Sequence, residues 1–311
     1  MKQYFLGQID GCGCGIGHKL YTYLSTLFYS KFLNLEYCCV PFPTDICWDN
    51  LHNIDWEEFF SLGLNEITEN ELIKNGYIIN KLDELNLVNL KNHINQYNVI
   101  NNTLTSPIIW KCTFPVIHHF DESCVEIFRR KYNDSPYRQI MKTTYSPELI
   151  NITIHIRRGD YIYHATGNDE YVNSDEHRKY FQSRMKPISY YTNIMDKIIE
   201  LNCYNKPILF HLYTEQNIED INIFRKYNNI NIHMNNYTGI KQIFTDFVNG
   251  DIIIGSESAF TLITQMINNK ILLYPEASSF PVNNKNVVYC NNEGYFNENI
   301  FIDKLKQFNL Y

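Results

Sequence analysis

The chain has 311 residues, of which 44% are hydrophobic and 20% are charged. This composition excludes an intrinsically disordered protein, and the length allows two domains of ordinary size. The net charge of −7 excludes nucleic-acid binding through a general basic surface, so an anionic ligand requires a local basic pocket. No stretch approaches the roughly 20 apolar residues that span a bilayer, and residues 1–10 lack the pattern of a signal peptide.

The nine cysteines form no C-x-x-C pair, and the C-x-C at Cys12 and Cys14 has no matching second pair. His118 and His119 are adjacent on a strand-like segment, where neighbouring side chains face opposite ways and do not share a metal ion. We therefore expect no metal site and no bound cofactor, and we interpret the cysteines as mostly reduced thiols of a cytosolic protein.

The N-terminal part opens with a strand, a glycine-rich loop, a helix and a second strand. The predicted strand at 4–9 is followed by the loop at 11–18, by apolar residues at helical spacing over 20–32, and by a strand at 37–40. This order is typical of the start of a Rossmann-like domain.

Glycine occupies every second position of this loop, which includes Gly15 and Gly17 and ends at His18. Backbone N–H groups of such a loop can approach a ligand closely, and the N-terminus of the following helix adds partial positive charge. The spacing is not G-x-G-x-x-G and no acidic residue ends the second strand, which argues against a dinucleotide site. A tight turn with a purely structural His18 stays an alternative.

The middle of the chain is less informative. Its patterns predict helical or mixed segments at 54–62 and 70–90, a strand-like segment at 104–117 and a helix at 123–132. We place a domain boundary near Pro147, because the proline follows this region and precedes a new apolar strand.

That strand, at 151–156, carries alternating isoleucines and is predicted to be buried. It ends in Arg157 and Arg158, followed by Gly159 and Asp160. Two guanidinium groups at a glycine-containing turn after a strand are well suited to binding a diphosphate. They are always charged, and each can donate two parallel hydrogen bonds to phosphate oxygens. A surface arginine pair, or an exposed Arg-Gly-Asp adhesion tripeptide, is the alternative.

The remainder alternates strands and helices, which predicts a parallel sheet. A long polar segment at 163–186 contains Asp169 and Glu170, and loops of this length and polarity are often functional. Further elements are predicted as strands at 208–213, 229–233, 251–255 and 270–274, and as helices at 189–199, 219–226, 262–267 and 300–311. The last helix is expected to pack back across the domains.

The turn after the strand at 251–255 reads S-E-S-A-F-T over residues 256–261. Hydroxyl groups at a strand-to-helix turn can donate hydrogen bonds to a phosphate together with the N–H groups of the helix. A helix N-cap without a ligand is the alternative.

The segment His155 to Asp160, H-I-R-R-G-D, resembles the H-x-R-R-G-D motif of alpha-1,2-fucosyltransferases, within the wider fucosyltransferase superfamily. Two further segments are similar to that family in the same order along the chain. The G-I-G-H that ends at His18 resembles its glycine-rich loop, and residues 256–261 resemble its S-N-S-S-F-S turn, with departures at the second and fourth positions.

The resemblance implies an α/β fold of the GT-B type, in which two facing Rossmann-like domains have mainly parallel sheets. Domain 1–147 would form the acceptor side with the glycine-rich loop. Domain 148–311 would bind the GDP-sugar donor, and its last helix would pack back on the N-terminal domain. The implied donor-binding residues are Gly15, Gly17, His18, His155, Arg157, Arg158, Ser256, Ser258, Phe260 and Thr261.

The implied activity is that of an inverting, metal-independent glycosyltransferase of glycan biosynthesis, which moves fucose from GDP-fucose to a hydroxyl group of a glycan or glycoconjugate. Arg158, with Arg157, would bind the charge that develops on the β-phosphate. Asp160, Asp169 and Glu170 would be candidates for the general base, and Asp160 is equally suited to orienting an arginine.

Golgi members of the superfamily have an N-terminal membrane anchor, and this sequence shows none. We therefore expect a soluble, cytoplasmic protein of the bacterial or viral type, located in the host cytoplasm if viral. Two other functions stay open: a GT-B transferase that uses another nucleotide sugar, and a non-catalytic nucleotide- or sugar-binding relative.

Overall fold

The computed structural model describes residues 2–9, 15–40, 55–82, 87–100, 107–114, 120–159, 175–215, 221–234, 239–278 and 285–311. The chain divides into two compact units, Met1–Lys142 and Thr143–Tyr311. No helix in the described ranges is long and apolar enough to cross a membrane.

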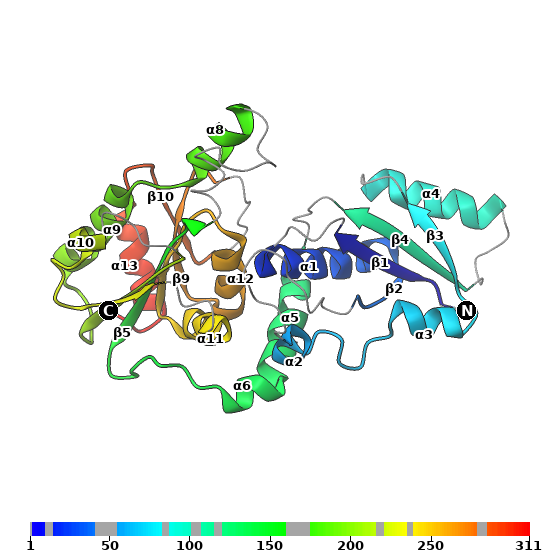
Figure 1. Ribbon diagram of the computed structural model, residues 1–311, viewed down its shortest axis with the longest axis horizontal. Coiled ribbons are helices and arrows are strands. Elements are labelled where there is room, and N and C mark those ends of the chain that lie inside the picture. The colour runs from blue at the N-terminus through cyan, green and yellow to red at the C-terminus, as the bar shows by residue number, and fades with distance from the viewer. Residues whose placement is uncertain are drawn as a thin grey trace. The chain divides into compact units, whose positions relative to one another are not determined.

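The first unit contains a parallel four-stranded sheet with the strand order β2-β1-β4-β3 (Figure 1). Its elements are β1 (Tyr4–Ile9), α1 (Ile16–Leu33), β2 (Glu36–Tyr37), α2 (Trp56–Phe60), α3 (Glu69–Lys74), β3 (Ile78–Leu82), α4 (Leu87–Ile100), β4 (Ile108–Phe114), α5 (Glu122–Asp134) and α6 (Pro136–Ile140).

Helices cover both faces of this sheet. Successive residues of a strand point to opposite sides, so β1 packs against helices on both faces. Phe5 of β1 packs in the cluster formed by α1 and α4, and its ring stacks on Tyr29 with centroids 5.7 Å apart. The next residue, Leu6, packs on the other face against Leu72 of α3.

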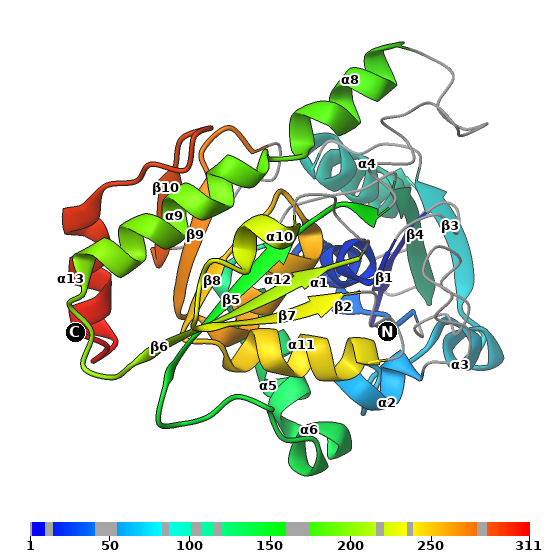
Figure 2. The same ribbon diagram turned by 60° about the vertical axis from the view of Figure 1, so that its left-hand side comes forward.

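The second unit contains a parallel six-stranded sheet with the order β10-β9-β8-β5-β6-β7 (Figure 2). Its elements are β5 (Ile150–Ile156), α8 (Asp175–Arg184), α9 (Ile188–Leu201), β6 (Ile208–Thr214), α10 (Ile221–Phe224), β7 (Ile230–Met234), α11 (Ile240–Asn249), β8 (Ile252–Ile254), α12 (Ala259–Asn268), β9 (Ile271–Pro275), β10 (Val287–Cys290) and α13 (Glu298–Gln307).

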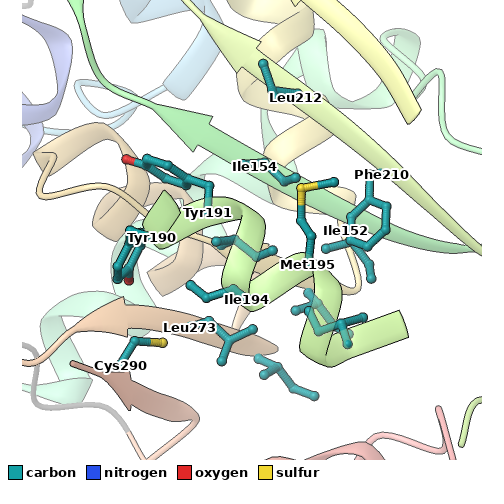
Figure 3. Packing of buried hydrophobic residues seen from close by; sticks show 14 of the residues in the cluster. Ile152, Ile154, Tyr190, Tyr191, Ile194, Met195, Phe210, Leu212, Leu273 and Cys290 are labelled. Atoms are coloured by element: carbon teal, nitrogen blue, oxygen red, sulfur yellow. The ribbon is translucent and has the colours of Figure 1, made fainter. Parts of the chain in front are cut away.

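β5 lies in the middle of this sheet and is buried along its whole length. Its isoleucines, including Ile152 and Ile154, pack with Tyr191 and Met195 of α9 in one apolar cluster that α10 and α13 also join (Figure 3). Each fully buried isoleucine contributes about 1.5–3 kcal/mol to folding. The intervening residues of β5, His155 among them, face the side of α11 and α12.

Two segments differ in part from the sequence predictions. The polar segment 163–186, predicted as a loop, ends in α8, which has Asp175 and Glu176 in its first turn and Arg184 in its last, where each charge complements the helix dipole. The segment 70–90 also contains the edge strand β3, because the chain leaves α3 through Gly76 at φ 85°.

Candidate functional site

Three neighbouring strands of the second unit end at the same edge of the sheet. β5 pairs with β6 so that Ile156 lies opposite Thr214, and with β8 so that Ile154 lies opposite Ile254. The residues that follow these strands therefore meet at the carboxyl edge, which is where open α/β sheets bind ligands. The predicted arginine motif and the serine turn both lie at this edge.

Glu215, the first residue after β6, is the centre of this arrangement. Its Oε1 accepts a hydrogen bond from the Arg157 guanidinium, and its Oε2 accepts one from the Arg158 backbone N–H at 2.9 Å. The Nε2 atom of His155 lies 3.4 Å from the same Oε1. Burial acts to raise the pKa of the Glu215 carboxyl, but the Arg157 charge and the hydrogen bonds outweigh it and hold this pKa well below its usual range.

Gly159 allows the turn to wrap closely around this carboxylate. Its φ of +26° lies in the left-handed region, and a Cβ atom built on it would be 3.3 Å from Glu215 Cβ and 3.5 Å from Arg157 Nη1. A larger residue would have to displace the ion pair or strain the backbone. The glycine is therefore part of the reason that the arginine and the glutamate can meet here.

The two arginines differ in how they are held. The Arg157 side chain is 22% exposed and pairs with Glu215. Arg158 is 9% exposed, and its guanidinium donates to two main-chain oxygens, that of Arg157 at 3.0 Å and that of Lys186 at 2.8 Å. Arg158 thus ties the end of β5 to the segment between α8 and α9, whereas Arg157 presents the more accessible guanidinium.

His155 connects the arginine turn with the turn after β8. Its Nδ1 lies 2.7 Å from Thr261 Oγ1 and 3.3 Å from Ser256 Oγ. Because a carboxylate only accepts hydrogen bonds, the contact of Nε2 with Glu215 requires a proton on Nε2. Gly255 lets Thr261 come this close, since a Cβ there would lie 2.7 Å from Thr261 Cγ2.

Ser258 and Phe260 shape this turn from within. Ser258 is the N-cap of α12, and its hydroxyl accepts a hydrogen bond from the Phe260 N–H at 3.3 Å. The Phe260 ring packs edge-on against His155, with centroids 5.8 Å apart, and against Phe247 of α11. Both residues therefore support the imidazole and the helix end from one side.

A second ion pair lies beside the serine turn. Arg184, at the end of α8, places its Nε 3.4 Å from Glu257 Oε1 and its Nη2 3.4 Å from the Glu257 main-chain oxygen. Both side chains are buried. Two residues further on, Lys186 accepts the hydrogen bond from Arg158 through its main-chain oxygen.

Positive charge exceeds negative charge around the arginine turn and the serine turn. The described side chains that carry charge there are Arg157, Arg158, Arg184 and Lys186 on one side and Glu215 and Glu257 on the other. Further along the same edge, Glu276 after β9 and Glu293 after β10 are exposed carboxylates. In a chain with a net charge of −7, this is a local basic site of the kind that an anionic ligand needs. Within the described ranges, no group of three or more His, Cys, Asp or Glu residues is arranged to hold a metal ion.

The predicted donor-binding residues belong to both units of the structure. The members near the carboxyl edge are His155, Arg157, Arg158, Ser256, Ser258, Phe260 and Thr261. Gly15, Gly17 and His18 belong to the first unit, where Gly15 is the N-cap of α1 and Gly17 is buried in its first turn. Asp160, Asp169 and Glu170 lie outside the described residues.

Sequence reasoning missed Glu215, Arg184 and Lys186. The signal for Glu215 was its place two residues after the strand predicted at 208–213, in the region where polar ligand-binding residues occur in parallel sheets. Arg184 and Lys186 are cations in a segment interpreted only as a polar loop. Their positions next to Glu257 and Arg158 depend on the tertiary fold.

No protein-family model matches the sequence, and no curated protein matches it. Solved structures of fucosyltransferases do have a similar backbone. POFUT1 in complex with GDP-fucose has a TM-score of 0.52 at 10% sequence identity, over 90% of this chain and 97% of that chain. The POFUT1 apo-form has a TM-score of 0.51 at 12% identity, over 86% and 94%.

The fucosyltransferase NodZ from Bradyrhizobium has a TM-score of 0.48 at 10% identity, over 95% of this chain and 97% of that chain. At these identities the similarity to POFUT1 concerns the fold. The chain is a two-unit α/β protein with parallel sheets and the GT-B fold, which confirms the predicted fold class.

Proposed function

We propose that this chain is a glycosyltransferase that moves fucose from GDP-fucose to a hydroxyl group of a glycan acceptor. In this proposal the reaction inverts the configuration at the anomeric carbon, needs no metal ion, and resembles that of the alpha-1,2-fucosyltransferases, whose arginine motif residues 155–160 resemble.

The observation that carries the proposal is the oriented guanidinium of Arg157 at the carboxyl edge of the second sheet. It is partly exposed, it is held by the Glu215 carboxylate, and it belongs to a segment that resembles a fucosyltransferase motif. The fold is that of POFUT1, which has been solved in complex with GDP-fucose. A basic edge in a fold of this kind favours a diphosphate-containing donor.

The chemistry follows from where charge develops. The acceptor oxygen forms a bond to the anomeric carbon from one face, while the bond from that carbon to the β-phosphate oxygen breaks on the other. The electron pair of the broken bond stays on the phosphate oxygen, so GDP leaves with an additional negative charge. A fixed guanidinium stabilises this charge without reorganisation, and each charge-assisted hydrogen bond contributes about 1.5–3 kcal/mol.

We assign the phosphate contact to Arg157 and a supporting role to Arg158. The Arg158 guanidinium already donates to two main-chain oxygens and is largely buried, so its loss acts first on the shape of the turn. The acceptor proton passes to a general base, for which Asp160, Asp169 and Glu170 stay the candidates from the sequence.

The test is a donor panel measured with a chelator present. We expect GDP and GDP-fucose to raise the thermal unfolding midpoint, because a ligand at 100 times its dissociation constant adds about 2.7 kcal/mol to stability. GDP-fucose should also release fucose slowly without an acceptor. The Arg157→Met variant removes only the guanidinium and is expected to lose most of the stabilisation by GDP.

GDP-mannose, UDP-glucose and UDP-N-acetylglucosamine complete the panel. A preference for a uridine donor, or an absolute need for a divalent metal, would contradict the proposal. Binding of GDP with neither hydrolysis nor transfer would identify a non-catalytic relative instead.

A further inference from the structure

Lys186 joins the two halves of the carboxyl edge. Its main-chain oxygen accepts a hydrogen bond from Arg158 at 2.8 Å, which fixes it to the arginine turn. Two residues before it, Arg184 is paired with Glu257 in the serine turn. The side chain of Lys186 therefore starts between the two groups of residues that are proposed to surround the donor.

No carboxylate among the described residues pairs with the ammonium group of Lys186. The residue is only 5% exposed, and its Nζ donates to the neutral amide oxygen of Asn292 at 3.2 Å. Across the described parts of the chain it contacts no carboxylate. By contrast, the buried Arg184 is paired with Glu257. Burying a charge without an opposite charge is unfavourable, so buried charges in proteins are normally paired. An unpaired buried charge is expected mainly at a functional site.

Asn292 places the end of the Lys186 side chain at the carboxyl edge of the sheet. Asn292 follows β10, whose strand is parallel to the rest of the sheet, so it lies at the same carboxyl edge as Glu215 and the serine turn. It is itself exposed. The lysine side chain thus extends to an exposed residue at this edge, and a neutral amide is a partner that an anion can replace without breaking an ion pair.

We propose that Lys186 is a further phosphate-binding residue, whose missing counter-ion is the diphosphate group of the donor. In this arrangement Arg157 and Lys186 bind the diphosphate from two sides, and Arg158 fixes the distance between them through its bond to the Lys186 main chain. The inference rests on the proposed function for the identity of the nucleotide only, because inorganic pyrophosphate presents the same charged group.

The experiment is a calorimetric titration of inorganic pyrophosphate, GDP and GDP-fucose into the full chain, with the unfolding midpoint of each free protein measured alongside. Lys186→Met keeps the unbranched apolar stem of the side chain and removes its charged end. We expect pyrophosphate to bind about tenfold to a hundredfold more weakly, while the unfolding midpoint stays equal or rises because an unpaired buried charge has been removed.

Asn292→Asp gives a second variant that keeps the fold and the lysine. It places a carboxylate at the atom that now accepts the lysine hydrogen bond. We expect a higher unfolding midpoint and at least about fivefold weaker binding of pyrophosphate, because the ammonium then has an internal counter-ion. Lys270→Met is the matched control, since Lys270 is paired with Asp251 at 2.8 Å at the opposite end of the strands. It should leave pyrophosphate binding unchanged.

Wild-type affinity for pyrophosphate in both Lys186→Met and Asn292→Asp would overturn the inference, as would a wild-type protein that does not bind pyrophosphate at all. Should Lys186→Met fail to fold, Asn292→Asp decides alone. If pyrophosphate binding depends on Lys186 but the wild-type protein binds neither GDP nor GDP-fucose, the phosphate site stands and the proposed function fails.

Discussion

In the Glu215→Gln variant the carboxylate that orients Arg157 becomes a neutral amide of nearly the same shape. The Arg157 guanidinium and the Arg158 N–H then lose a charge-assisted acceptor. Removing one partner of a buried ion pair typically costs about 3–5 kcal/mol. Taking about 3 kcal/mol, because Arg157 is partly exposed, we expect the unfolding midpoint at pH 7 to fall by about 6–12 °C for a unit of this size.

The pH dependence of the stability difference between the wild-type protein and Glu215→Gln identifies the Glu215 carboxylate as its cause. Burial acts to raise the pKa of Glu215, but Arg157 and the hydrogen bonds lower it by more, so the pKa is lower in the folded protein than in the unfolded chain. The ionised carboxylate therefore stabilises the fold at pH values above its ordinary pKa of 4.5. That effect is lost as the pH falls toward the lower folded-state value. The difference between wild-type protein and variant should therefore be largest near neutral pH and should shrink below pH 4.5.

Two measurements check this prediction. Thermal unfolding gives the midpoint, and steady-state kinetics with GDP-fucose give KM and kcat. We expect KM to rise more than kcat falls, because a disordered guanidinium binds the donor less well before the reaction starts. The exposed Glu148→Gln is the control for loss of one negative charge from the same unit. An unfolding midpoint within about 1 °C of the wild-type value, with an unchanged KM, would refute the role given to Glu215.

Two further predictions concern Arg158 and His211. We expect Arg158→Ala to lower turnover, because the arginine turn loses its shape, and to lower the free energy of unfolding by about 2–4 kcal/mol, because two hydrogen bonds to main-chain oxygens are lost. Urea unfolding measures this loss, and an unfolding free energy equal to that of the wild-type protein would count against the contacts. Burial, with His233 nearby, lowers the pKa of His211 to about 4 from 6.5, so its neutral form is favoured in the fold and the unfolded chain takes up the proton first. His211 should lower the stability by about 2 kcal/mol between pH 7.5 and pH 5, and the fall should be smaller by that amount in His211→Gln, where His233, whose pKa is also lowered by burial, still contributes. Equal slopes for both proteins would show that another group is responsible.

The sequence predicted the central elements of the second unit because their signals are local. The strand at 151–156 is β5, and the strands predicted at 251–255 and 270–274 are β8 and β9. A run of isoleucines between turn signals needs no knowledge of the rest of the fold. β10 has four residues and was missed, since its stability comes from pairing with β9 rather than from its own pattern.

The site was harder to predict because it depends on register. Glu215 meets Arg157 because Ile156 lies opposite Thr214, and one residue of slippage between β5 and β6 would separate them. Nothing in the local sequence states which strand lies beside β5 or in which register. The arginines and serines could therefore be proposed from residue types and a family resemblance, whereas the glutamate that orients them could not.

Glu257 illustrates how the fold accommodates a buried carboxylate in the turn after β8. The fucosyltransferase turn that residues 256–261 resemble has asparagine at the position of Glu257. Burying a carboxylate at this position would be strongly unfavourable without an opposite charge beside it. Arg184 meets this carboxylate from the end of α8 and also donates to its main-chain oxygen. The substitution in the turn and the cation on the helix are thus physically coupled. Because the pair cancels its own charge, the positive charge available to a ligand at this edge comes from the arginine turn and from Lys186.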